Sequence, residues 1–153
     1  MSDSSLLFDL PISIRQFLPH REPMLMVDDV LELDNEHITT NFKISSDNIF
    51  VENGLFREVG IIENAAQTCS GIVGWPHFEE NKSKEDYSII GYISRVKSVD
   101  IFTLPPVDAV LITKGKLLSM HEIGGIYNCD MSCNTELDGK IIAISKFGLI
   151  IRP

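Results

Sequence analysis

The sequence predicts an α+β fold in which one antiparallel sheet wraps around one long, buried helix. Residues 56–74 are the one long segment with a helical apolar period, whereas most of the chain after them is strand-like. That helical segment is apolar on most sides, so other elements have to cover it. A chain of 153 residues is also the size of one domain. We therefore expect a single domain, residues 1–153, with one core between sheet and helix.

The N-terminal part of the chain predicts a short helix and then a hairpin. Residues 11–17 have the pattern of a short helix. Apolar residues recur over residues 24–33, and residues 37–44 alternate between apolar and polar side chains, so both segments are predicted strands. An Asp-Asn pair lies between them and is a turn signal. The two strands are therefore expected to pair.

A loop rich in Ser, Asp, Asn and Gly, residues 45–54, precedes the predicted helix of residues 56–74. The helix is indicated by apolar residues that follow the 3.6-residue period, namely Val59, Ile62, Ala66, Cys69 and Val73. We expect Pro76 to end this helix, because proline lacks the backbone N–H and clashes with the preceding turn.

Four further strands are predicted after the helix, each rich in β-branched or aromatic residues. They cover residues 87–99, 109–120, 125–135 and 140–151. An Asp-Gly pair between the last two is a strong hairpin signal. The expected order is therefore a short helix, two strands, the long helix and four strands.

Composition and charge exclude several classes of function. Thirteen Lys and Arg residues against 22 Asp and Glu residues give a net charge of −9. Binding to a phosphate backbone needs clustered positive charge, so no nucleic-acid partner is expected. The first ten residues lack the basic start of a secretory signal, and no apolar run reaches the roughly 18 residues of a membrane span. The odd number of cysteines, three, fits buried, reduced thiols. These features predict a cytoplasmic protein.

Four segments resemble, in the same order, the motifs of one enzyme family. Residues 18–28, LPHREPMLMVD, resemble its LPHRxPfLLVDrV signature, and residues 61–67, IIENAAQ, resemble its lIIEamAQ helix. Residues 91–108 resemble its strand and turn that end in P-G-D, and residues 138–144 resemble its vdGkvvaeA segment. The family is that of the 3-hydroxyacyl-acyl-carrier-protein dehydratases. The resemblance covers nearly the whole chain and implies the hotdog fold.

The resemblance also implies a reaction with two proton transfers. A base takes a proton from the carbon next to the thioester carbonyl, and an acid protonates the departing hydroxyl. In the family these groups are a His of an N-G-H-F-P-G-H-P loop and the Glu of the buried helix, contributed by opposite subunits of a dimer. Glu63 matches the Glu, but Ile49 occupies the position of the first loop His and Asn53 that of the second. Isoleucine cannot carry a proton, so the usual base is missing.

The implied site is centred on Glu63. A carboxylate within an apolar helix is costly unless it is paired or protonated, which suits a general acid. In the structural alternative, Gln67 at position i+4 caps this carboxylate. Backbone N–H groups near Val59 and Gly60 are the predicted donors to the thioester oxygen. The predicted substrate-binding residues are Asn53, Val59, Gly60, Phe56, Ile62 and Gln67.

Other residues of the chain are candidates to replace the missing base. Glu52 and Asp47 in the altered loop are carboxylates that can accept a proton. His20 lies within the Pro-His-Arg signature, where we expect a mainly structural role. The remaining histidines, His37, His77 and His121, are expected at the surface.

Two other functions stay open beside a dehydratase. Asn and Gly beside a helix Glu also resemble hotdog thioesterases, in which the carboxylate directs water at a thioester. A subunit without its base would instead bind acyl chains and supply Glu63 to an active relative. In each case the expected partner is an acyl-carrier-protein or CoA thioester. We expect a homodimer, a higher oligomer or a hetero-oligomer with such a relative, and no cofactor or metal.

Overall fold

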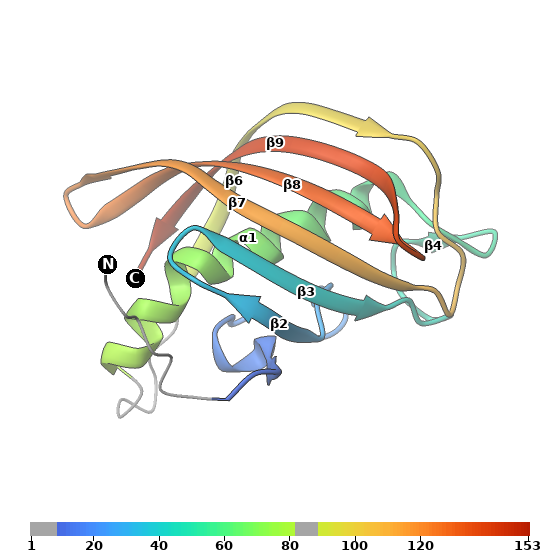
Figure 1. Ribbon diagram of the computed structural model, residues 1–153, viewed down its shortest axis with the longest axis horizontal. Coiled ribbons are helices and arrows are strands. Elements are labelled where there is room, and N and C mark those ends of the chain that lie inside the picture. The colour runs from blue at the N-terminus through green and yellow to red at the C-terminus, as the bar shows by residue number, and fades with distance from the viewer. Residues whose placement is uncertain (1–8, 82–88) are drawn as a thin grey trace.

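The computed structural model describes residues 9–81 and 89–153. Within these ranges a seven-stranded antiparallel sheet wraps around one long helix, α1 (Glu58–Asn81), as Figure 1 shows. The strand order is β1-β2-β3-β7-β8-β9-β6. The prediction of an α+β fold with a sheet around one helix is confirmed.

The N-terminal segment contains less regular structure than predicted. A two-residue strand, β1 (Ile12–Ser13), is followed by a 3₁₀ turn, η1 (Ile14–Gln16), in place of a helix over residues 11–17. Strand β2 (Asp29–Leu33) begins later than predicted. The apolar residues before it are buried. The backbone N–H and carbonyl of Met26, however, form hydrogen bonds with side chains of α1 and not with a neighbouring strand.

The predicted hairpin is present, and the loop after it carries a second one. Strand β3 (His37–Lys43) pairs with β2 on one side and with β7 (Val110–Ile123) on the other. In the following loop, β4 (Val51–Glu52) and β5 (Leu55–Phe56) form a small separate sheet. Its turn is Asn53-Gly54, with φ values of 53° and 78°, a conformation for which Asn-Gly is well suited.

Helix α1 is longer than the sequence predicted, and the expectation that Pro76 ends it is wrong. The helix continues through Pro76 to Asn81. Packing of the added turn outweighs the lost backbone hydrogen bond. Trp75 is buried, and the ring of Phe78 lies edge-on against Phe17 with the centroids 5.4 Å apart.

The three remaining long strands are β6 (Ile90–Ile101), β8 (Ile126–Leu137) and β9 (Lys140–Arg152). The predicted hairpin between the last two is confirmed, with Asp138 and Gly139 both at positive φ. The first two residues of the predicted strand 87–99 lie outside the described residues. Strand β6 pairs with β9 and forms one edge of the sheet.

Two apolar clusters fill the space between the sheet and α1. One surrounds the middle and C-terminal part of the helix, and the other surrounds its N-terminal turn, including Phe56 and Ile61. The three cysteines, Cys69, Cys129 and Cys133, are unpaired and buried, as predicted. No helix among the described residues is long and apolar enough to span a membrane.

Candidate functional site

Glu63 lies on the second turn of α1, half-buried, and is held by a neighbour on the same helix. Its Oε1 accepts a hydrogen bond of 2.7 Å from Nε2 of Gln67. Its Oε2 has no hydrogen-bond partner among the described residues. The carboxylate is therefore oriented on one side, and its other oxygen is available to a bound molecule.

Gln67 also fastens the loop before β2 to the helix. Its Nε2 donates to the carbonyl oxygen of Met24 at 2.8 Å, and its Oε1 accepts from the backbone N–H of Met26 at 2.7 Å. Asn64 adds a bond of 2.7 Å from Nδ2 to the carbonyl of Met26. Gln67 is only 2% exposed, so water does not compete for these hydrogen bonds. The amide thus joins Glu63 and the loop in one rigid unit.

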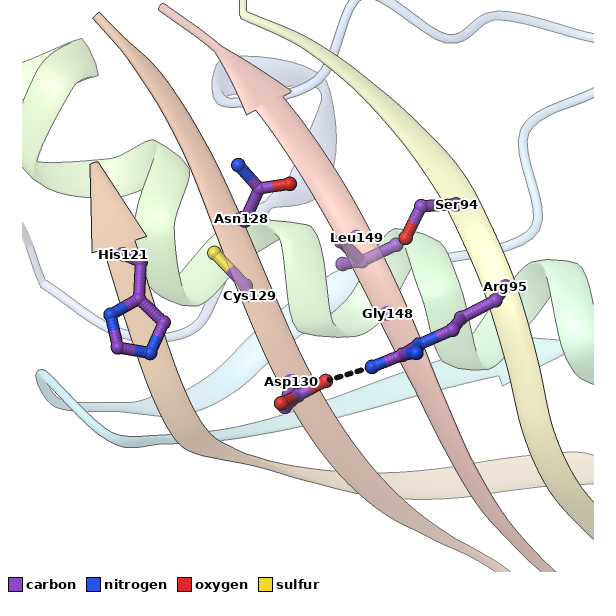
Figure 2. Close-up of a pocket in the computed structure, with 8 residues that line it drawn as sticks. All are labelled: Ser94, Arg95, His121, Asn128, Cys129, Asp130, Gly148 and Leu149. Atoms are coloured by element: carbon purple, nitrogen blue, oxygen red, sulfur yellow. Dashed lines mark ion pairs between the residues drawn. The ribbon is translucent and has the colours of Figure 1, made fainter. Parts of the chain in front are cut away.

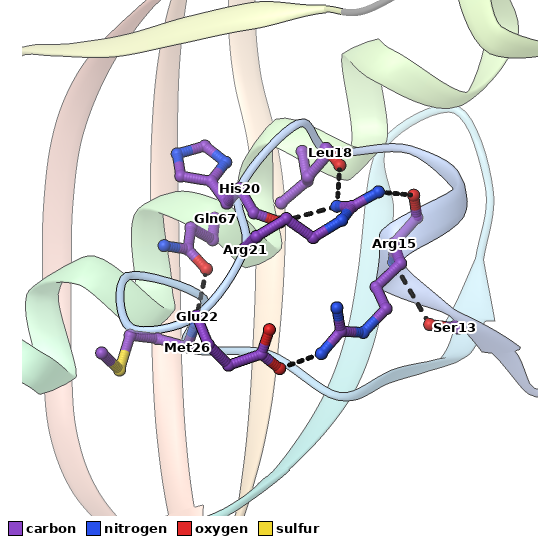
Figure 3. A network of polar contacts seen from close by, with 8 residues as sticks. All are labelled: Ser13, Arg15, Leu18, His20, Arg21, Glu22, Met26 and Gln67. Atoms are coloured by element: carbon purple, nitrogen blue, oxygen red, sulfur yellow. Dashed lines mark hydrogen bonds and ion pairs between the residues drawn. The ribbon is translucent and has the colours of Figure 1, made fainter. Parts of the chain in front are cut away.

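The LPHR segment forms a compact turn over the helix, shown in Figure 3. The Arg21 guanidinium donates to the carbonyl oxygens of Leu18 at 2.9 Å, His20 at 2.6 Å and Arg15 at 3.3 Å. Arg15 in turn forms an ion pair with Glu22. These bonds fix the backbone of residues 18–22. Figure 3 also shows the His20 ring extending to the same side of the turn as Gln67.

His20 and Glu63 line the same cavity. It has a volume of about 240 Å³ and is formed by the turn, the helix and the edge strand β6. Its lining residues are His20, Glu63, Ala66, Gln67, Ser70, Gly91, Tyr92, Ile93 and Leu149. The sequence predicts a mainly structural role for His20. The contact between the LPHR turn and the helix, more than 40 residues away, has no local signal in the sequence.

Burial lowers the pKa of His20 below its ordinary value of 6.5. The negative charge of Glu63 opposes this shift, and the positive charge of Arg21 adds to it. The Nδ1 atom of His20 is buried without a hydrogen-bond partner among the described residues. An imidazolium needs acceptors for two N–H groups, so this environment favours the neutral ring.

The altered loop does not bring a replacement base to Glu63. Ile49, where the family has its His, is 48% exposed and lines a different cavity of about 340 Å³, together with Asp47. Glu52 is exposed in β4. Asn53 is also exposed, and its positive φ serves the turn between β4 and β5. None of these residues lines the Glu63 cavity.

The remaining predicted substrate-binding residues lie in or next to the first turns of α1. The Gly60 N–H donates to the carbonyl of Arg57 at 3.0 Å, whereas that of Val59 has no partner among the described residues. Phe56 is fully buried, and a side chain at Gly60 would clash with its ring. Ile62 is half-buried. Roles for these four residues in binding a substrate stay predictions.

A third cavity lies on the outer face of the sheet. It has a volume of about 360 Å³, and Figure 2 shows Arg95 of β6 reaching across β9 toward Asp130 of β8, with α1 behind the strands. Asp130 is paired with Lys97 at 2.7 Å and with Arg95 at 3.8 Å. The hydrogen bond from Lys97 lowers the pKa of Asp130. Both cations are thus paired with Asp130, and because each of the three side chains is at least 35% exposed, the pairs add little to stability.

A family model described as ApeP-like, ApeP dehydratase, matches residues 12–146. The chain belongs to the ApeP-like family. Its similarity to the dehydratases therefore covers the LPHR turn, the altered loop, α1 and most of the sheet. The sequence-based identification of a dehydratase-like protein with a hotdog fold is confirmed.

Two bacterial relatives carry the name 3-hydroxyacyl-[acyl-carrier-protein] dehydratase FabZ. The protein of Streptococcus pyogenes serotype M3 (strain MGAS315) is 32% identical over 136 residues, which are 85% of this ApeP-like chain and 89% of that protein. The protein of Teredinibacter turnerae is 39% identical over 84 residues. That second match spans 51% of this chain and about half, 56%, of the relative's length.

Solved structures with the same fold include dehydratases and thioesterases. The dehydratase heterocomplex ApeI:P from Xenorhabdus doucetiae matches with a TM-score of 0.72 at 18% identity, covering 95% of this chain and 93% of that one. A hypothetical thioesterase from Streptococcus pneumoniae matches with a TM-score of 0.59 at 13% identity, covering 80% and 88%. At these identities the likeness establishes the hotdog fold of the ApeP-like chain.

Proposed function

We propose that this ApeP-like chain is a subunit of a dehydratase that removes water from a 3-hydroxyacyl thioester, with Glu63 as the general acid. The observation that carries the proposal is the position of Glu63. This carboxylate lines a cavity, is oriented through one oxygen by Gln67, and stands on the helix that matches the dehydratase motif. A proton on its free Oε2 would be delivered to the departing hydroxyl group.

The proposed substrate is an acyl chain linked as a thioester to a carrier protein or to CoA. Both FabZ relatives are named for acyl-carrier-protein substrates. In this chain the cavity presents the apolar side chains of Ala66, Ile93 and Leu149 beside the polar Glu63. Such a lining suits the first carbons of an acyl chain next to a reacting hydroxyl. We place the reaction in fatty-acid or related lipid, polyene or pigment synthesis in the cytoplasm.

We further propose that the subunit works as a dimer or in a hetero-oligomer with another dehydratase. Strand β6 forms an edge of the sheet and carries exposed apolar side chains, with Tyr92 at 59%, Val96 at 46% and Ile93 at 37% exposure. A long unprotected edge favours pairing with a second chain. Because Tyr92 and Ile93 also line the Glu63 cavity, a chain added at this edge would close the site. The solved structure from Xenorhabdus doucetiae is itself named a dehydratase heterocomplex.

The function is tested with the purified chain, alone and co-expressed with a family relative that carries the loop histidine. A 3-hydroxyacyl carrier-protein thioester and the matching 2-enoyl thioester are supplied, and the products are identified by mass. We expect loss or addition of water that disappears in Glu63→Gln and persists in Glu32→Gln, a surface control on β2. Release of free acid would replace the proposal with a thioesterase. No conversion in either preparation would overturn it.

A further inference from the structure

We propose that His20 is the base that works opposite Glu63, so that one chain supplies both proton-transfer groups of the site. The inference rests on the dehydratase function proposed above. It assigns the role of the missing loop histidine to a residue of the LPHR turn. The two side chains reach the same cavity of about 240 Å³ from different elements, the turn and α1.

Hydrogen bonds hold the Glu63 carboxylate on the helix and the backbone of His20 in the turn. Gln67 binds Glu63 directly and ties the loop at Met24 and Met26 to the helix. Arg21 holds the backbone carbonyl of His20 itself at 2.6 Å. The Glu63 carboxylate and the backbone from which the His20 ring extends are therefore both held by hydrogen bonds. Proton transfer in an enzyme requires such fixed positions of the acid and the base.

The surroundings of His20 keep its ring neutral, which is the form that accepts a proton. The buried Nδ1 atom has no partner, so the cavity-lining ring has Nε2 as its accessible nitrogen. The titratable or charged groups around it are Glu63 from α1, Arg21 from its own turn and Tyr92 from β6. Desolvation and Arg21 lower the pKa of His20, and Glu63 would stabilise the imidazolium once it forms.

The proposed steps balance without an added reactant. Neutral His20 takes the proton from C2 of the 3-hydroxyacyl thioester, and the electrons of that C–H bond form the C2=C3 double bond. The C3–O bond breaks, and the hydroxyl leaves as water with the proton from Glu63. His20 is then protonated and Glu63 is ionised. Transfer of one proton from the imidazolium to the carboxylate restores both groups.

The other histidines are placed elsewhere. His37 pairs with Asp34 at the turn between β2 and β3, with its Nδ1 atom 3.2 Å from the Asp34 carboxylate. The ring of His77 lies against Tyr127, with the centroids 5.3 Å apart. His121 lines the cavity on the outer face of the sheet. Among the described residues that line the Glu63 cavity, His20 is thus the one histidine.

The test measures dehydration and hydration by the chain alone and in complex with a relative that carries the loop histidine. His20→Gln removes the base but keeps a polar side chain of similar length, and His121→Gln is the matched control. We expect His20→Gln to lower kcat/KM at least about 100-fold, as loss of a general base does. We also expect it to remove the acidic limb of the pH–rate profile. His121→Gln should keep the wild-type rate and profile.

Each other outcome is decisive in a different way. If His20→Gln keeps its rate and its acidic limb while Glu63→Gln is inactive, the role of His20 is overturned and the dehydratase function stands. The role of His20 is likewise overturned if activity appears only in the complex and His20→Gln does not change its rate. If Glu63→Gln also changes nothing, both proposals fail.

A spectroscopic measurement covers the case in which His20→Gln is poorly folded. The imidazole of His20 is titrated by NMR in the wild-type chain and in Glu63→Gln. We expect a midpoint below 6.5 in the substrate-free wild type, where the Glu63 carboxylate raises it, and a further decrease in Glu63→Gln. In the proposed reaction, bound substrate displaces water from this carboxylate and so favours its protonated form. A midpoint that does not respond to Glu63→Gln would show that the two groups are not coupled, and would overturn the proposal.

Discussion

The Nε2 atom of Gln67 donates a hydrogen bond of 2.7 Å to Oε1 of Glu63, one helical turn earlier in α1. The same amide accepts from the backbone of Met26 and donates to that of Met24. One buried side chain therefore both orients the carboxylate and holds the loop that follows His20. The capping of Glu63 by Gln67, which the i+4 spacing indicated, is present in the structure.

Replacing Gln67 should weaken the fold and the site together. Gln67→Leu keeps the approximate volume but leaves the buried N–H of Met26 without an acceptor, which costs about 1–3 kcal/mol. We expect urea denaturation to show a loss of this size in the free energy of unfolding. Gln16→Leu, on the exposed side of the 3₁₀ turn, is the control and should stay within about 0.5 kcal/mol. Equal stability of the two variants would contradict this account of Gln67.

A second prediction concerns the buried hydroxyl pair that joins β3 to α1. Thr40 and Thr68 are both 0% exposed, and their Oγ1 atoms lie 2.8 Å apart. Thr40→Val or Thr68→Val leaves one hydroxyl buried without its partner and should cost about 1–3 kcal/mol. The double variant removes both hydroxyls, so its loss should be smaller than the sum of the two. A double-mutant cycle from denaturation curves measures this difference. Strictly additive losses would mean that the pair does not interact.

Most of the fold was predictable because it follows from local patterns. The helical period around Ala66 and Cys69, the alternation in β3 and the Asp-Gly turn at Asp138 each specify an element without help from distant residues. The end of α1 was not predictable in this way. Phe78 packs on Phe17, 61 positions earlier, and this contact stabilises the part of α1 that follows Pro76.

The candidate site was predictable only in part, and for the same physical reason. Glu63 and Gln67 share one helix, so their spacing predicts their contact. His20 reaches the cavity because buried amides of α1 bind the loop after it, and those bonds join residues about 40 positions apart. The apolar run before β2 has the sequence pattern of a strand, but the structure places it in the loop. Its backbone partners are side chains, which alternation does not reveal.

Glycine at position 60 should be required by the packing of Phe56. A Cβ there would overlap two carbons of the Phe56 ring, which is fully buried. We expect Gly60→Ala to cost about 1–3 kcal/mol, as overpacking of a core does. Gly74→Ala, in the same helix, is the matched control, since its Cβ would lie 3.3 Å from a methyl group of Ile89. There the better helix propensity of alanine, up to about 1 kcal/mol, offsets the contact. Thermal melts of both variants test the difference, and equal melting temperatures would refute it.

His20 should make the stability of the folded chain depend on pH. Its pKa in the folded state lies below the value of 6.5 expected in the unfolded state, chiefly because of burial. At a pH between these two values the unfolded chain binds more protons, so stability increases with pH. The free energy of unfolding should therefore fall as pH decreases through 6.5 toward the folded-state pKa of His20. Well above pH 6.5, His20 is neutral in both states and adds nothing to the pH dependence of stability.

His20→Asn removes this titration, so the variant should lose less stability than the wild type over that interval. The comparison uses urea denaturation at a series of pH values, with His121→Asn as the control for removal of an imidazole outside the Glu63 cavity. Asp28, whose pKa burial raises, titrates in every variant and cancels in the difference. Parallel curves for the wild type and His20→Asn would mean that the His20 ring is solvated in the folded chain, and that it does not share a desolvated cavity with Glu63.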